Sequence, residues 1–174
     1  MEGLRPTTAL GVLGVMVLHL GIVRTVVTPG PWHSFHHGVE TWAWLTLHGA
    51  LEDAEVGVPH GTGAYAWIRL AQLLDPDPFG AVALLSTLGV GLAFLTLRAL
   101  LADDAWALGA AAVLAFLPAR LRLAHTETIY VAVEVAVWVA LLAAEVHLRR
   151  RTPGSFVVAA LALAVAMTSH LEVM

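Results

Sequence analysis

The sequence predicts an all-α protein, a polytopic membrane bundle of about five transmembrane helices with interfacial helices in its first outer loop. Two observations support this prediction. Of the 174 residues, 59% are hydrophobic and 13% are charged, whereas soluble domains carry about 25% charged residues. The hydrophobic residues also gather in runs of about 20, the length that an α-helix needs to cross a bilayer.

Five apolar runs are the candidate spans. Their expected bounds are residues 7–27, 79–101, 105–123, 128–148 and 154–170. Thr152 can cap the fifth helix, and Pro153 suits its first turn, where proline loses no backbone hydrogen bond. Pro118 lies inside the third run. That run is long enough to span only if the side chains of Arg120 and Arg122 extend outward.

Arginine placement predicts the orientation of the spans, because cytoplasmic loops carry an excess of positive charge. The run Arg149 to Arg151 is the densest basic cluster, so we expect it to be cytoplasmic. Because successive spans cross the membrane in opposite directions, the turn at 102–104 and the N-terminus are then cytoplasmic too. Residues 28–78 and 118–127 then lie outside, where residues 63–74 form an apolar helix too short to span. The expected location is an inner membrane of bacterial type, with the functional face extracytoplasmic.

The end of the sequence predicts that more chain follows. We expect residues 1–174 to form one transmembrane domain. Its last apolar run has no polar tail and stops at "SHLEVM". Because polytopic proteins usually end in a solvated segment, we expect this chain to be the front part of a longer protein. A genuinely short protein is the alternative.

Composition excludes several classes of function. The sequence has no cysteine, so disulfides, iron–sulfur clusters and thiolate zinc sites are impossible. Its formal net charge of −4 offers no basic surface for nucleic acid. Membrane lipids are therefore expected partners, and other membrane subunits are a further class of partner.

Histidines concentrate in the first outer segment, in the stretch "PGPWHSFHHGVETWAW". In a helix, His33 and His37 are four residues apart, as are His36 and Glu40, so each pair shares a face. Imidazoles and a carboxylate on one face can bind a divalent metal ion, and His125 of the second outer segment joins the candidate ligands. There are two alternatives. The histidines lie in the interface and bind only headgroups and water, or they bind a phosphate or sugar directly.

Two carboxylates belong to the fourth apolar run. Glu127 lies at its outer edge, and Glu134 follows seven residues later, which puts both on one helix face. A carboxylate within a span usually faces a polar cavity or a charged partner. Arg120 and Arg122 lie at the same outer level and are candidate partners. The pattern predicts either a substrate site or an ion pair that ties the third run to the fourth.

His19 lies in the outer half of the first run. A histidine there is either a hydrogen-bonded packing residue or an axial ligand for haem or chlorophyll. The second interpretation supports an alternative function, a non-catalytic membrane subunit within a larger assembly. The "GVG" at residues 89–91 predicts only close packing between helices.

Several short elements follow one another in a characteristic order. His60 and Tyr65 lie where members of one superfamily have an "HPPL-Y" or "HGP-L-Y" element, and "FG" at 79–80 precedes the second run. Pro118 ends an apolar stretch ahead of "HTETIY" at 125–130. The chain thus resembles the N-terminal half of the GT-C superfamily, polyprenyl-phosphate-sugar-dependent glycosyltransferases of the protein mannosyltransferase and aminoarabinose transferase type.

The resemblance implies transfer of a sugar from a polyprenyl phosphate to an acceptor at the extracytoplasmic face. It implies an acidic residue at Glu40, next to Val39, where members often have an aspartate. A carboxylate would take the proton of the acceptor hydroxyl, and arginine or a divalent ion would stabilise the departing phosphate. The candidate catalytic residues are Glu40 and Glu127, and the candidate substrate-binding residues are Arg120, Arg122, His60, Tyr65 and Glu134.

Overall fold

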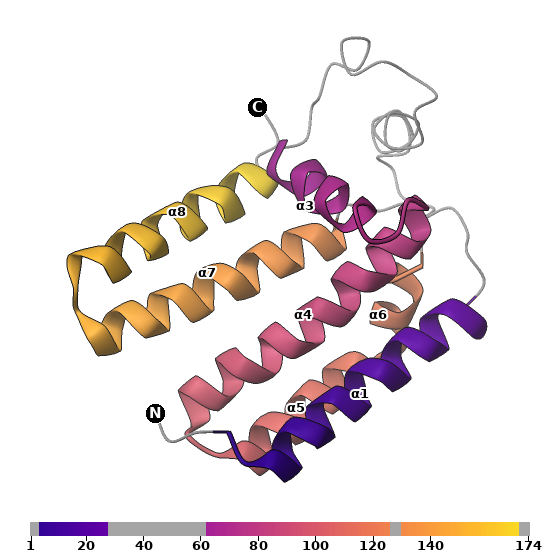
Figure 1. Cartoon of the computed structure of the whole chain (residues 1–174), viewed down its shortest axis with the longest axis horizontal. Helices are drawn as coiled ribbons and strands as arrows, with labels where there is room; N and C mark the ends of the chain where they lie inside the picture. The colour runs from indigo at the N-terminus through magenta and orange to yellow at the C-terminus, as the bar shows by residue number, and fades with distance from the viewer. Residues whose placement is uncertain (1–3, 28–61, 126–129, 171–174) are drawn as a thin grey trace.

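The computed structural model describes residues 4–27, 62–125 and 130–170, and these residues form α-helices joined by short turns (Figure 1). The all-α class is confirmed for this part of the chain. The helices are α1 (Pro6–Thr25), α3 (Thr62–Gln72), α4 (Pro78–Leu101), α5 (Asp104–Ala115), α6 (Pro118–Leu123), α7 (Tyr130–Arg150) and α8 (Pro153–His170).

Three of these helices are long and apolar enough to cross a membrane. They are α1 with 20 residues, α4 with 23 from Phe79 to Leu101, and α7 with 21. The apolar helices α5 and α8 are shorter. Helices of this length and composition are consistent with an integral membrane protein, while the expected total of five spans stays a prediction.

The third run does not form the continuous helix that we expected over residues 105–123. Helix α5 ends at Ala115, and a separate helix, α6, begins at Pro118. Proline has no N–H to donate and its ring clashes with the preceding turn, so a helix cannot continue through it without a break. The 12 residues of α5 extend for about 18 Å, well short of the roughly 30 Å of a hydrocarbon core.

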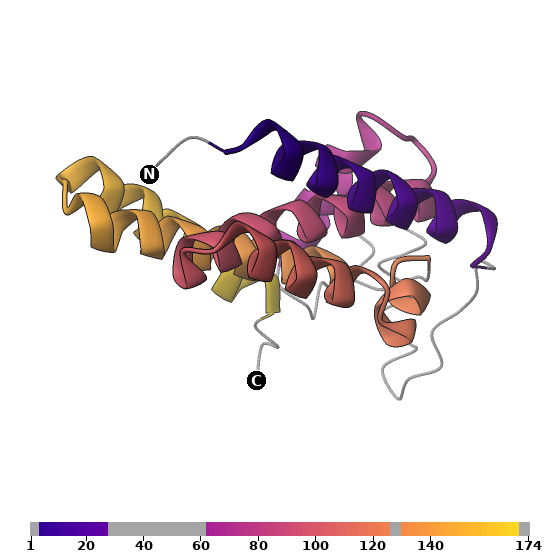
Figure 2. The same ribbon diagram turned by 90° about the horizontal axis from the view of Figure 1, so that it is seen from below.

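The helices form a flat bundle in which neighbours along the chain mostly lie side by side. Helix α7 lies between α4 and α8, and α5 packs on the other side of α4 (Figure 1). Helix α1 lies across one face of α4 and α5, as the view turned by 90° shows (Figure 2). The short helix α3 packs across the ends of α4, α7 and α8. The longest helices therefore run between two opposite ends of the molecule.

The turns between the long helices lie at these two ends. The start of α1, the turn between α4 and α5, and the turn between α7 and α8 lie at one end, which we call the arginine-rich end (Figure 1). The end of α1, the helices α3 and α6, and the starts of α4 and α7 lie at the other, which we call the α3–α6 end. Which end faces the cytoplasm stays a prediction.

Helix α3 confirms the helix that we expected near residues 63–74. Its residues Ala64 and Ile68 are fully buried against α4 and α7, in a cluster that includes Val82 and Val135. The alanine at this contact lets the helix axes approach closely, as is typical of membrane bundles. The short helix thereby closes the α3–α6 end of the bundle.

Side-chain caps fix where two helices begin after tight turns. Asp103 Oδ1 accepts hydrogen bonds from the backbone N–H of Ala105 at 2.8 Å and of Trp106 at 2.9 Å. At the start of α8, Ser155 N donates to Thr152 Oγ1 at 3.2 Å, which confirms the predicted cap. Each cap satisfies donors that the first turn of a helix leaves without an intrahelical partner.

Ala102, at the C-terminal end of α4, has a left-handed backbone with φ 56°. This conformation strains residues that carry a Cβ but not glycine. We expect Ala102→Gly to raise the free energy of unfolding by about 0.5 kcal/mol, measured by reversible unfolding in mixed micelles. The same substitution at Ala110, exposed inside α5, should lower it by about 1 kcal/mol. Equal losses in both variants would contradict the backbone argument.

Candidate functional site

A network of buried polar side chains lies between the helices near the α3–α6 end. Arg120 of α6 is 6% exposed, and its Nη1 donates to Glu134 Oε1 of α7 in an ion pair. Its Nη2 donates to the backbone carbonyl of Ser86 on α4 at 2.9 Å. Trp138 Nε1 donates to the same Glu134 oxygen at 2.9 Å. One guanidinium thus joins three helices, and its charge is balanced by a carboxylate.

His19 of α1 extends this network. It is fully buried, with Nδ1 2.8 Å from the carbonyl oxygen of Ala115 and Nε2 2.9 Å from Ser86 Oγ. A carbonyl oxygen only accepts hydrogen bonds, so Nδ1 carries the proton, and in the neutral ring Nε2 accepts from the Ser86 hydroxyl. Both nitrogens are engaged in this arrangement. It matches the packing interpretation of His19 and leaves neither nitrogen turned toward a haem or chlorophyll.

Gly89 makes room for the buried guanidinium. A Cβ at this position would lie 2.8 Å from Arg120 Nη2, closer than Cβ atoms approach other heavy atoms. The sequence predicts close contact between helices at residues 89–91. A Cβ added at Gly91 would lie 3.1 Å from Met16 Sδ, so Gly91 does lie at a contact with α1. At Gly89, however, the absence of a side chain leaves room for the charged guanidinium of Arg120 inside the bundle.

The Nε donor of Arg120 is not used by these contacts. Its Nε is buried and has no hydrogen-bond partner among the described residues. A buried polar group without a partner costs about 1–3 kcal/mol, so such groups are rare in native structures. Trp67 Nε1 of α3 is a second donor of this kind. Nε is therefore the donor of this guanidinium that neither the carboxylate nor the carbonyl uses.

A second set of polar contacts lies at the outer edge of the same end. Arg24, in the last turn of α1, forms an ion pair with Asp75, which follows α3. Asp77 caps α4 by accepting from Gly80 N at 2.8 Å, and a Cβ at Gly80 would overlap the Asp75 carboxylate. The glycine of the "FG" element therefore allows Asp75 to reach Arg24. This contact ties α1 to the start of α4.

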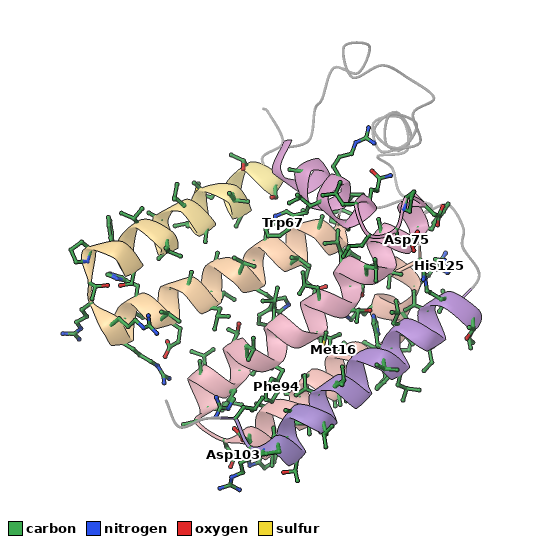
Figure 3. The ribbon with its side chains drawn as sticks, viewed as in Figure 1. Met16, Trp67, Asp75, Phe94, Asp103 and His125 are labelled. Atoms are coloured by element: carbon green, nitrogen blue, oxygen red, sulfur yellow. The ribbon has the colours of Figure 1, made fainter. Side chains whose placement is uncertain are left out.

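His125 lies at the same edge as Asp75, whereas Asp103 lies at the opposite end (Figure 3). Its Nδ1 donates to the carbonyl of Val27 at 2.6 Å, and its ring meets Phe79 edge-on with centroids 6.0 Å apart. A metal-binding histidine commonly donates one N–H to a carbonyl and ligates with the other nitrogen. With Nδ1 as the donor, Nε2 is the ring nitrogen of His125 that would ligate a metal ion.

The structure brings together part of the predicted set. Arg120 and Glu134 form an ion pair, which is one of the two alternatives that we drew from their spacing. Arg122 of α6 is exposed, and Tyr65 lies in α3. Within residues 4–27, 62–125 and 130–170 there is no group of three or more potential metal ligands. The other candidates lie outside the described residues: His33, His36, His37, Glu40, His60 and Glu127.

Sequence reasoning missed the residues that connect Arg120 to the rest of the bundle. Ser86 binds both His19 and Arg120, and Trp138 binds Glu134. One signal was present in the sequence, because Ser86 and Gly89 are three residues apart and share a face of α4. A serine and a glycine one turn apart in an apolar helix indicate a polar group packed against that face.

Within the described residues, the chain is all-helical, has three helices long and apolar enough to cross a membrane, and holds a buried arginine–carboxylate pair. Comparison of the chain with protein-family models, with curated proteins and with solved structures finds no match. The resemblance to the GT-C superfamily is thus a hypothesis that depends on the order of short sequence elements.

Proposed function

We propose that this chain is a membrane glycosyltransferase, or part of one, that takes a sugar from a polyprenyl phosphate and acts at the α3–α6 end. The observation that supports this proposal is the unused, buried Nε donor of Arg120. A guanidinium is the side chain best suited to bind phosphate oxygens, since it offers several donors in one plane. A phosphate of a lipid-linked sugar is an acceptor of the required kind.

The connectivity of the chain also supports a catalytic site at the α3–α6 end. Helix α1 ends and α3 begins there, and α6 ends and α7 begins there (Figure 1). Residues 28–61, which carry Glu40, and residues 126–129, which carry Glu127, are therefore both joined to the α3–α6 end. The two segments that carry the candidate catalytic carboxylates therefore begin and end at the end of the bundle that holds Arg120.

In the proposed reaction, Glu40 takes the proton from the acceptor hydroxyl as its oxygen attacks the anomeric carbon. The bond between that carbon and the phosphate oxygen breaks, and the polyprenyl phosphate leaves with the negative charge. Arg120, held in position by Glu134, stabilises this charge, and Arg122 is the second candidate. A divalent ion on His125 and the histidines at 33, 36 and 37 would add to the same stabilisation.

Transfer of a labelled sugar tests this function. The full chain, or its longer parent, is reconstituted in lipid vesicles with a radiolabelled sugar on a polyprenyl phosphate, and product is counted. We expect Glu40→Gln to lower transfer by about 10²-fold or more, because it removes the general base. Glu52→Gln, the same change in the same segment at a residue with no proposed role, should retain the wild-type rate.

Two results would contradict the proposal. One is a complete lack of transfer by the wild-type chain and its longer parent with every lipid-linked sugar tried. The other is an equal loss of transfer in Glu40→Gln and Glu52→Gln, which would mean that the substitutions act through general destabilisation.

A further inference from the structure

A second site candidate lies at the arginine-rich end, far from the network around Arg120. A partly open cavity of about 820 Å³ lies there between the start of α1, the α4–α5 turn and the last turns of α7. Its volume falls within the roughly 300–1,000 Å³ of ordinary ligand sites. Leu95, Leu142 and Val146 form an apolar part of its wall, and charged side chains form the rest.

One side of the cavity is built by an ion pair between α4 and α5. Arg98 Nε donates to Asp104 Oδ1 at 2.6 Å, and Thr8 Oγ1 of α1 donates to Asp104 Oδ2 at 3.2 Å. The hydrogen bond from Arg98 lowers the pKa of Asp104 below its ordinary value. Asp104 therefore carries a negative charge at neutral pH, while its two oxygens fix three helices to one another.

The other side of the cavity is built from α7. Arg149 Nε donates to Glu145 Oε1 at 2.6 Å, and its Nη2 donates to the carbonyl of Ala99 on α4. Arg149 thus bridges α7 and α4 across the end of the bundle. These contacts join the helices around the cavity to one another.

The charges of the cavity wall are balanced. Three guanidinium groups face three carboxylates, those of Arg5, Arg98, Arg149, Asp103, Asp104 and Glu145. Arg5 makes no ion pair or hydrogen bond with its side chain among the described residues. A balanced wall has no net field to attract a purely anionic ligand. It suits a ligand that carries both charges.

We propose that this cavity binds the headgroup of a phospholipid with a phosphate and a primary ammonium, that is, of the phosphatidylethanolamine type. The phosphate binds Arg5 and Arg149, and the ammonium donates its three hydrogens to the carboxylates around Asp104 and Glu145. Leu142 and Val146 contact the glycerol and the first acyl carbons. The cavity lies where α4 and α7, both long enough to span, reach the level of lipid headgroups.

Lipid binding by the full chain tests this site. The purified protein is delipidated in detergent and titrated with phosphatidylethanolamine, phosphatidylglycerol or phosphatidylcholine of identical acyl chains, with native mass spectrometry as the readout. We expect phosphatidylethanolamine to bind about tenfold more tightly than either of the others. The quaternary ammonium of phosphatidylcholine cannot donate hydrogen bonds, and phosphatidylglycerol has no ammonium to face the carboxylates.

Variants locate the binding to the cavity. Arg5→Gln removes a guanidinium that supports no ion pair or hydrogen bond within the described residues, so the fold is retained, and it should weaken phosphatidylethanolamine binding about tenfold. Arg69→Gln, at an exposed position of α3 at the opposite end, should leave it unchanged. Equal or tighter binding of phosphatidylglycerol, equal binding of phosphatidylcholine, or no effect of Arg5→Gln would each overturn the proposal. None of these outcomes bears on sugar transfer at the α3–α6 end.

Discussion

Glu134→Leu should destabilise the protein by about 3 kcal/mol. The change removes the carboxylate that balances Arg120, whose side chain is 6% exposed. An unpaired charge inside the bundle keeps its desolvation cost without the attraction that offset it. The substitution also removes the acceptor of Trp138 Nε1. Reversible unfolding in mixed micelles, followed by circular dichroism, measures the effect.

Two further variants test whether the loss comes from the uncompensated charge. Glu145→Leu removes the carboxylate of an ion pair whose arginine is exposed, and should cost only about 1 kcal/mol or less. The double variant Arg120→Met with Glu134→Leu leaves no charge unpaired and should recover most of the stability. If the double variant loses as much stability as Arg120→Met and Glu134→Leu lose when their separate effects are added, the charge argument is wrong.

Gly89→Ala is expected to cost about 2 kcal/mol in the same assay. The added methyl group would lie 2.8 Å from Arg120 Nη2. The guanidinium cannot retreat without breaking its hydrogen bond to the Ser86 carbonyl or its ion pair with Glu134. The cost therefore comes from displacing a buried charge and not from helix propensity, since alanine is the better helix former.

Two glycines of the same sequence provide matched controls. A Cβ added at Gly109, inside α5, would meet no other atom within 4 Å. Gly109→Ala should therefore raise the free energy of unfolding by about 1 kcal/mol. Gly91→Ala meets only the flexible thioether of Met16, and this side chain can move aside at little cost. A stabilising Gly89→Ala would contradict the position of Arg120 against α4.

Much of the fold follows from hydropathy and helix-end signals. The run expected at 7–27 forms α1 (Pro6–Thr25), and the run expected at 79–101 forms α4 (Pro78–Leu101). The run expected at 128–148 includes most of α7 (Tyr130–Arg150). These segments are predictable because a long apolar run has few alternatives to a helix in a membrane. The break at Pro118 was visible, but hydropathy gives no weight to the backbone hydrogen bonds that proline removes.

The candidate site was less predictable. Spacing brought Glu134 and two arginines into consideration but did not choose between Arg120 and Arg122. Residues two apart on a helix face different sides, and only the orientation of α6 determines which one enters the bundle. The bond between His19 and Ser86 joins residues 67 positions apart, so it depends on how α1 packs on α4. No local pattern encodes that contact.

The short length of α5 has a consequence for the surrounding lipid. At about 18 Å, this helix covers little more than half of the hydrocarbon thickness, and the charged turn of α6 follows at once. Acyl chains beside this flank must shorten or tilt to avoid the exposed Arg122, so the bilayer is expected to be thinner there than elsewhere around the bundle. A lipid-borne phosphate that diffuses in the plane of the membrane would meet its lowest barrier at this indentation.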